Sequence, residues 1–173
     1  MKQQILLFFI GLFWMHLAFS QPIVIVKGTE DSLALKKQIT QYLDYLDVRG
    51  NVHLTVSFTT LMSDYMEGMT FCLNSPFPTT YQVIRVRIDA RLSKILQSRV
   101  LAHEMIHVKQ FAKGELMTIN RQQVTWKGQK YWCLGSSQRS APWEREAHQI
   151  GKILAGLDTV QPEAPLAAAG KNR

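Results

Sequence analysis

Hydrophobic and polar residues recur with a changing period along the chain, and each change of period predicts a different element. Apolar residues at helical spacing predict a helix that begins near Asp31 and ends near Val48. From residue 52 to 59 apolar residues occupy every second position, which is the period of a half-buried strand. Short runs of strand-forming residues at 23–26 and 69–73 predict two further strands.

The second half of the chain changes period in the same way. Residues 83–89 alternate between apolar and charged side chains and predict a strand, which we expect at an edge of the sheet. Residues 92–113 show helical spacing, and Gly114 after them is typical of a helix C-terminus. A hairpin at 124–132 and a last helix at 142–157, which opens on proline, complete the pattern.

This order of elements predicts an α+β domain. We expect a small mixed or antiparallel sheet that packs on the long helix at 92–113 and on the C-terminal helix that follows it. The folded domain is expected to span residues 21–157. Residues 158–173 are rich in Pro and Ala and predict a flexible C-terminal tail.

The first 20 residues differ from the rest of the chain. After Lys2 comes an almost purely apolar run at 5–19, which ends in the small-residue pattern Ala-Phe-Ser. Such a succession is typical of a secretory signal peptide, and the run is shorter than the roughly 20 residues that cross a bilayer as a helix. An uncleaved anchor would have to extend through residues 23–26, past the interruption at Gln21-Pro22. We therefore expect cleavage of residues 1–20, export to the periplasm or the medium, and no stable membrane insertion afterwards.

Composition narrows the class of protein. The 173 residues are 46% hydrophobic with two cysteines, which excludes collagen, a disulfide-rich miniprotein and a mainly disordered chain. The 20 Lys and Arg against 13 Asp and Glu give a net charge of +7. These basic residues are scattered and no nucleic-acid motif occurs, so no nucleic-acid partner is expected. After export, Cys72 and Cys133 can form one disulfide; two buried thiols are the alternative.

Candidate chemistry is concentrated in the long helix, which carries His-Glu-Met-Ile-His at 103–107. Residues four apart lie on one helix face, so His103 and His107 can bind the same metal ion. Glu104 lies beside that face, where its carboxylate can accept a proton from a water on the metal. Two imidazoles and an adjacent carboxylate are the groups that a zinc hydrolase requires, which predicts a bound Zn²⁺.

A catalytic zinc ion takes three protein ligands and leaves one position open. The chain lacks a third histidine at the close spacing HExxHxxGxxH. The last helix offers three candidates for the third ligand, namely Glu144, Glu146 and His148. Residues two apart on a helix point in different directions, so Glu144 and Glu146 cannot serve equally.

Three segments together resemble the small bacterial gluzincin-type metallopeptidase domains. They are HEMIHVKQ at 103–110, Trp-x-Gly-x-x-Tyr at 126–131 and Pro-Trp-Glu-Arg-Glu-Ala at 142–147. The resemblance covers residues 83–157 and implies a zincin-like fold and a zinc-dependent endopeptidase that acts on proteins or peptides. It also implies Glu146 as the third zinc ligand, with Glu144 beside the ligands or at the surface.

A peptidase also requires a donor for the oxyanion that forms during hydrolysis. Tyr131 is our favoured donor, because its hairpin joins the two helices that carry the proposed ligands. The alternatives are Tyr81, Arg139, Arg145 and His148.

In zinc peptidases of this type, an edge strand before the metal helix pairs with an extended substrate. We expect the strand at 83–89 to do so, with Arg85 and Arg87 favouring acidic groups nearby; alternatively, these charges protect an exposed edge from aggregation. A function of a different class is a non-catalytic exported protein with a structural zinc site. In that case a fourth side chain, for which His148 is the nearest donor, closes the site.

Overall fold

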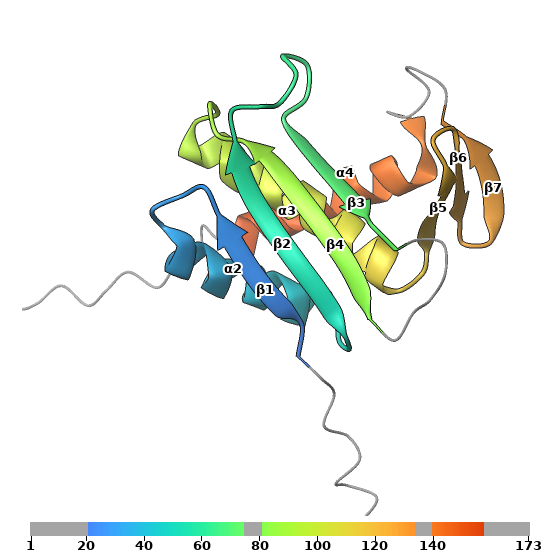
Figure 1. The fold of residues 1–173 in the computed structure, drawn as a ribbon, viewed down its shortest axis with the longest axis horizontal. Coiled ribbons are helices and arrows are strands. Elements are labelled where there is room, and N and C mark those ends of the chain that lie inside the picture. The colour runs from blue at the N-terminus through green and yellow to red at the C-terminus, as the bar shows by residue number, and fades with distance from the viewer. Residues whose placement is uncertain (1–20, 75–80, 134–139, 158–173) are drawn as a thin grey trace, which may run out of the picture.

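The computed structural model describes residues 21–74, 81–133 and 140–157. The expected signal peptide at 1–20 and tail at 158–173 lie outside these residues. The elements are β1 (Ile23–Lys27), α2 (Ser32–Tyr45), β2 (Val52–Thr59), β3 (Gly68–Cys72), β4 (Gln82–Asp89), α3 (Lys94–Ala112), β5 (Leu116–Asn120), β6 (Gln123–Trp126), β7 (Gln129–Trp132) and α4 (Pro142–Leu157). Figure 1 shows their arrangement, which confirms the predicted α+β class.

A four-stranded sheet forms the first layer, with the strand order β1-β2-β4-β3. β1 pairs with β2 and β2 with β4 in parallel, whereas β3 runs antiparallel to β4. The apolar positions of β2 and β4 alternate as predicted, and Leu54, Val56, Ile84 and Val86 are fully buried. Because it contains both parallel and antiparallel pairs, the sheet is mixed, as predicted.

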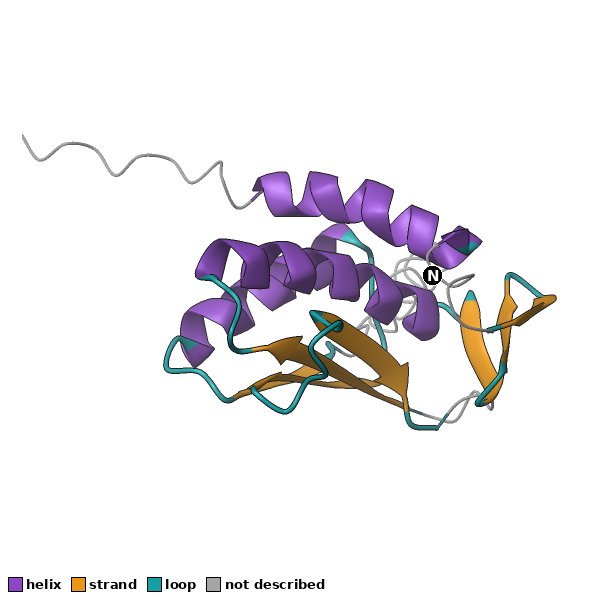
Figure 2. Cartoon of the chain, turned by 90° about the horizontal axis from the view of Figure 1, so that it is seen from above, coloured by secondary structure: helices purple, strands orange, loops and turns teal. Residues whose placement is uncertain are grey.

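All three described helices lie on one face of this sheet (Figure 2). α2 packs on β1, and α3 packs on β3 and β4. α4 packs mainly on α3, on the side away from the strands. The long helix α3 is consequently enclosed between the sheet and α4, and its residues Leu101, Met105 and Ile106 are fully buried. Within the described ranges, no helix combines the length and the apolar character that a bilayer-spanning segment requires.

The strand at 83–89 is not an edge strand, so the expected edge position was wrong. It forms most of β4, which lies between β2 and β3 in the sheet. The short strand β3 precedes β4 in the chain and pairs with it antiparallel, on the side of β4 opposite β2. The edge beside α3 therefore belongs to β3, and Arg85 and Arg87 lie on the face of the sheet that no described helix covers.

The hydrogen-bond pattern of β3 leaves its outer side open. The backbone N–H of Asp89 donates to the Glu67 carbonyl, and the N–H of Leu73 donates to the Val83 carbonyl. Bonding alternates along an antiparallel pair, so the residues whose backbone groups face outward are Gly68, Thr70 and Cys72. No strand in the described part of the chain pairs with that side of β3.

A second sheet of three strands, β5-β6-β7, follows α3. β6 and β7 form the predicted hairpin, with Lys127 and Gly128 at φ angles of 47° and 84° in its turn. Two successive positive φ angles are typical of two-residue hairpin turns. The helix α3 ends at Ala112, and Gly114, predicted to follow the helix C-terminus, has a positive φ of 67°. The strand β5 was not predicted.

The two cysteines do not form the expected Cys72–Cys133 disulfide. Cys72 ends β3 in the first sheet, whereas Cys133 follows β7 of the second sheet, and both side chains are half-buried. The Cys72 thiol donates to Oδ1 of Asn74 at 3.3 Å.

Candidate metal centre

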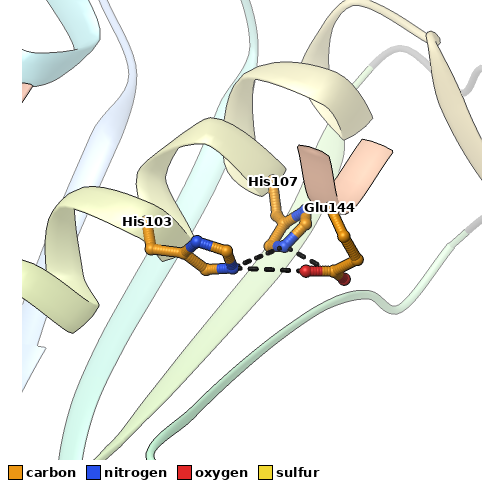
Figure 3. A group of neighbouring side chains, drawn as sticks. All are labelled: His103, His107 and Glu144. Carbon is orange, nitrogen blue, oxygen red and sulfur yellow. Dashed lines mark hydrogen bonds and ion pairs between the residues drawn. The ribbon is translucent and has the colours of Figure 1, made fainter. Parts of the chain in front are cut away.

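His103 and His107 lie one turn apart on α3, and their rings point toward the same place (Figure 3). Their Nε2 atoms are 3.2 Å apart. The helix that carries them is unbroken, and its N-terminus is capped by the Ser93 hydroxyl, which accepts a hydrogen bond from the N–H of Leu96. The predicted placement of both imidazoles on one helix face is thus present.

The third member of the group is Glu144, in the first turn of α4. Its Oε2 lies 3.4 Å from His103 Nε2, and its Oε1 lies 3.4 Å from His107 Nε2. One potential ligand atom from each of the three side chains lies within 4.8 Å of the others. Together His103, His107 and Glu144 form a group that could hold a metal ion, and we call it the metal triad.

Close packing of α4 on α3 brings Glu144 to the histidines. A Cβ atom on Gly151 would lie 3.1 Å from the Cα of His103, so glycine at this position allows the two helices to approach closely. Trp143 and Ala147 on α4 are buried, with exposed fractions of 6% and 0%. Their burial sets the rotation of α4 about its axis, and in that rotation Glu144 faces His103 and His107.

Glu146, which the resemblance implied as the third ligand, lies outside the metal triad. Two residues along an α-helix correspond to a rotation of about 200°, so Glu144 and Glu146 have different neighbours. The Glu146 carboxylate accepts a hydrogen bond from Gln110 Nε2 at 2.8 Å and forms ion pairs with Lys109 at 3.4 Å and Lys127 at 3.7 Å. Glu146 is therefore held by cationic side chains, and Glu144 completes the metal triad.

Gln110 connects the metal triad to Glu146. Its Nε2 donates both to the Glu146 carboxylate and to the Trp143 carbonyl, at 2.8 Å and 3.0 Å. Both partners can only accept, so the amide orientation is fixed and Oε1 is the atom that lies 2.8 Å from His107 Nδ1. Oε1 can only accept, so Nδ1 carries the proton. In the neutral form of His107, which a metal ligand requires, the lone pair is consequently on Nε2, the atom that faces Glu144 and His103.

Replacing the fully buried Gln110 with leucine is expected to lower the metal affinity of the triad by about 10-fold to 100-fold. The substitution removes the acceptor that fixes the proton on Nδ1 of His107. The affinity can be measured by competition with a chelating dye. Gln149→Leu, on the exposed side of α4, is the matched control and should bind metal as tightly as the unaltered protein. Equal affinities for the two variants would contradict this role of Gln110.

Glu104 is buried between α3 and the edge strand β3. Its Oε2 accepts a hydrogen bond from the Thr70 hydroxyl at 2.6 Å. Its Oε1 faces Gly68, where an added Cβ atom would lie only 2.6 Å away. The edge strand thus holds the carboxylate of Glu104 beside the metal triad, whose charges act on it.

Replacing Gly68 with alanine is expected to destabilise the protein by about 1–3 kcal/mol, because its Cβ would overlap both Glu104 Oε1 and Val100 Cγ1. The strand would have to move away from α3. Urea unfolding measures the effect. At the helical Gly156, an added Cβ meets nothing within 4 Å, so Gly156→Ala should leave stability unchanged or raise it. If Gly68→Ala were as stable as Gly156→Ala, β3 and α3 would not pack as closely as the contacts at Gly68 indicate.

The two carboxylates near the histidines differ in proton affinity. Burial raises the pKa of Glu104, and the charges of His107 and His103 together with the Thr70 hydrogen bond offset this only in part. Burial also acts to raise the pKa of Glu144, but its hydrogen bonds to His103 and His107 outweigh that effect and hold this pKa well below its usual value. Glu144 is therefore ionised at neutral pH, as a ligand must be, while Glu104 has the higher affinity for a proton.

The candidates for an oxyanion donor occupy different places. The Tyr131 hydroxyl donates to Gln129 Oε1 at 2.9 Å, and its ring packs edge-on against Trp143 at 5.5 Å, so its proposed role stays a prediction. Among the alternatives, His148 lies beside the metal triad, with its ring centroid 4.6 Å from that of His103. Arg139 lies outside the described residues. Tyr81 and Arg145 are exposed.

Two residues of this region, Gln110 and Thr70, were missed by the sequence analysis. Gln110 follows His107 by three positions and so shares its helix face, a spacing that could have indicated it. Thr70 precedes Glu104 by 34 residues on a separate strand, and no local pattern connects them.

Comparisons of the chain with protein-family models, with curated proteins and with solved structures found no significant match.

Proposed function

We propose that this protein is an exported zinc metallopeptidase in which His103, His107 and Glu144 hold Zn²⁺ and Glu104 is the general base. The observation that carries the proposal is the spacing of the three ligand atoms beside a buried carboxylate. Export rests on the signal-peptide pattern of residues 1–20. The mixed sheet, the helix α3 and the helix α4 agree with the zincin-like fold that the resemblance implies.

The metal triad fits zinc in donor type and in spacing. Two imidazole nitrogens and a carboxylate oxygen are donors that zinc prefers, each at about 2.0–2.2 Å. Two such donors on a tetrahedral ion lie about 3.3 Å apart. In the metal triad the two Nε2 atoms are 3.2 Å apart, and each lies 3.4 Å from a different oxygen of the Glu144 carboxylate. The donors are therefore close enough for these three side chains to hold a zinc ion.

The fourth position favours a catalytic over a structural site. The group of mutually close ligand atoms consists of three side chains, and among the described residues it does not include His148. A structural zinc site is closed by four protein ligands, whereas a catalytic site has three and leaves room for water. A non-catalytic protein with a closed zinc site is therefore the weaker interpretation.

Glu104, oriented by Thr70, would carry out the proton transfers. A zinc ion bound by the metal triad would lower the pKa of a coordinated water to about 7 and polarise the carbonyl of the peptide bond. The Glu104 carboxylate, held at Oε2 by the Thr70 hydroxyl, would accept the proton of the attacking water. The raised pKa of Glu104 then suits the return of this proton to the leaving amine.

The open side of β3 is the surface that we propose for the substrate. A peptide that pairs with this edge would bond to the outward backbone groups of Thr70, whose side chain contacts Glu104. Main-chain pairing would thus place an extended peptide next to the general base. We therefore propose that β3, and not the strand at 83–89, pairs with the extended substrate.

A peptide-library cleavage assay tests the proposed function. The purified protein is incubated with a mixture of peptides, with and without a zinc chelator, and the products are identified by mass spectrometry. We expect internal peptide bonds to be cleaved, cleavage to stop with the chelator, and activity to return when zinc is restored. Cleavage that the chelator does not affect would contradict a zinc mechanism, and no cleavage with zinc bound would favour the non-catalytic alternative.

A further inference from the structure

A groove of about 670 Å³ runs between α3 and α4 and opens beside the metal triad. His103 and His148 line the end of the groove nearest the triad, and Ile95 and Gly156 line the far end. Ile95 is 68% exposed although it is apolar, so the far end presents an uncovered hydrophobic side chain.

Two facing rows of side chains form the walls of this groove. Positions four apart on α3 place Arg99, His103 and His107 on one face of that helix. The same spacing on α4 places Glu144, His148 and Lys152 on one face. The floor between the rows is made of small residues, namely Ala147, Gly151 and Ala155. The small side chains leave the space open, and the rows lead from the metal triad to two exposed cations.

The charge of the groove has one sign away from the metal triad. Arg99 and Lys152 are its only permanently charged lining residues in the described part of the chain, and no carboxylate lines it. Neither side chain forms an ion pair within the described residues, in contrast to Lys109, which is neutralised by Glu115 and Glu146. A groove with an apolar floor and two unneutralised cations is complementary to an anion attached to an apolar chain.

We propose that this groove binds a peptide substrate through a carboxylate group, which Arg99 and Lys152 hold while a neighbouring apolar side chain lies on the small-residue floor. The inference rests on the proposed peptidase function and adds a substrate class, namely acidic peptides. The carboxylate comes from an Asp or Glu side chain or from the peptide C-terminus. Two partly exposed charge pairs amount to a preference of about tenfold over an uncharged peptide.

Binding to a catalytically disabled protein tests the inference without relying on cleavage. Zinc-loaded Glu104→Gln protein is titrated into fluorescein-labelled octapeptides that differ only in two Glu or two Gln residues, all with amidated C-termini, and fluorescence anisotropy is recorded. We expect the Glu peptide to bind about tenfold more tightly, with a smaller difference at high salt. A third peptide, with Gln residues and a free C-terminus, shows whether a terminal carboxylate gives the same gain.

The double substitution Arg99→Gln and Lys152→Gln should remove this preference. Lys37→Gln combined with Arg121→Gln is the matched control, because it removes one Lys and one Arg at exposed positions outside the groove. Equal binding of all three peptides, or a preference that survives the groove substitutions, would overturn the inference. Cleavage of the Gln peptide by the unaltered protein tests the proposed function separately, so selective binding without any cleavage would refute the peptidase and leave the groove assignment intact.

Discussion

Replacing Glu104 with glutamine is expected to lower the rate of peptide hydrolysis by a factor of about 10² to 10⁴ while zinc remains bound. Glutamine has nearly the same shape as glutamate, and its amide can still contact the Thr70 hydroxyl that now donates to Oε2. It cannot accept the proton of the attacking water or return one to the leaving amine. Zinc content by elemental analysis and kcat/KM on a cleavable peptide are measured on the same preparation.

The exposed Glu30 provides the control for this experiment. Glu30→Gln makes the same chemical change at the surface before α2, and it should leave both zinc content and kcat/KM unchanged. Undiminished activity in Glu104→Gln would remove Glu104 from the mechanism. Loss of zinc from that variant would show instead that Glu104 supports the metal triad rather than the proton transfers.

Replacing Glu144 with alanine is expected to weaken zinc binding by a factor of at least about 100, whereas Glu146→Ala should weaken it by no more than about tenfold. Both carboxylate oxygens of Glu144 lie near the histidines, one 3.4 Å from His103 Nε2 and the other 3.4 Å from His107 Nε2. Glu146 acts only through Gln110, which it helps to orient.

The two variants are controls for each other, since they make the same truncation two positions apart on α4. Zinc dissociation constants from competition with a chelating dye, at one pH and one salt concentration, give the ranking. A larger loss in Glu146→Ala would return the third ligand to the residue that the resemblance implied. Equal losses would show that neither carboxylate binds the metal directly.

Local patterns predicted the elements of this fold well. The period-two runs of β2 and β4 and the helical run of α3 are each confirmed, because buried positions on one face leave a regular trace in the sequence. The order in which the strands pair in the sheet could not be predicted from these patterns. β3 pairs with β4 antiparallel and takes the edge, yet its pattern of half-buried residues gives no sign of its neighbours.

The candidate site was predictable where it lies on one helix. His103 and His107 meet because four positions make one turn, and this spacing is visible in the sequence. The third member depends on the rotation of α4 against α3, which Trp143, Ala147 and the close approach at Gly151 determine. Such a rotation is a property of tertiary packing, so the sequence left Glu144, Glu146 and His148 open, and only the resemblance favoured Glu146.

The contacts of Glu104 likewise join residues that are distant in the sequence, and no local pattern predicts them. Thr70 reaches its carboxylate from a strand 34 residues away, and Gly68 leaves the space in which that carboxylate lies. The expected disulfide is absent from the structure, and no sequence pattern described how the end of β3 lies relative to the residue after β7.

Crystals of the zinc-loaded protein, measured with X-rays on both sides of the zinc absorption edge, would test the central claim most directly. We predict one anomalous peak at about 2.0–2.2 Å from Nε2 of His103, Nε2 of His107 and a carboxylate oxygen of Glu144, with water at the remaining position. A peak bound to Glu146, a fourth bond from His148 that closes the site, or the absence of zinc between α3 and α4 would contradict it.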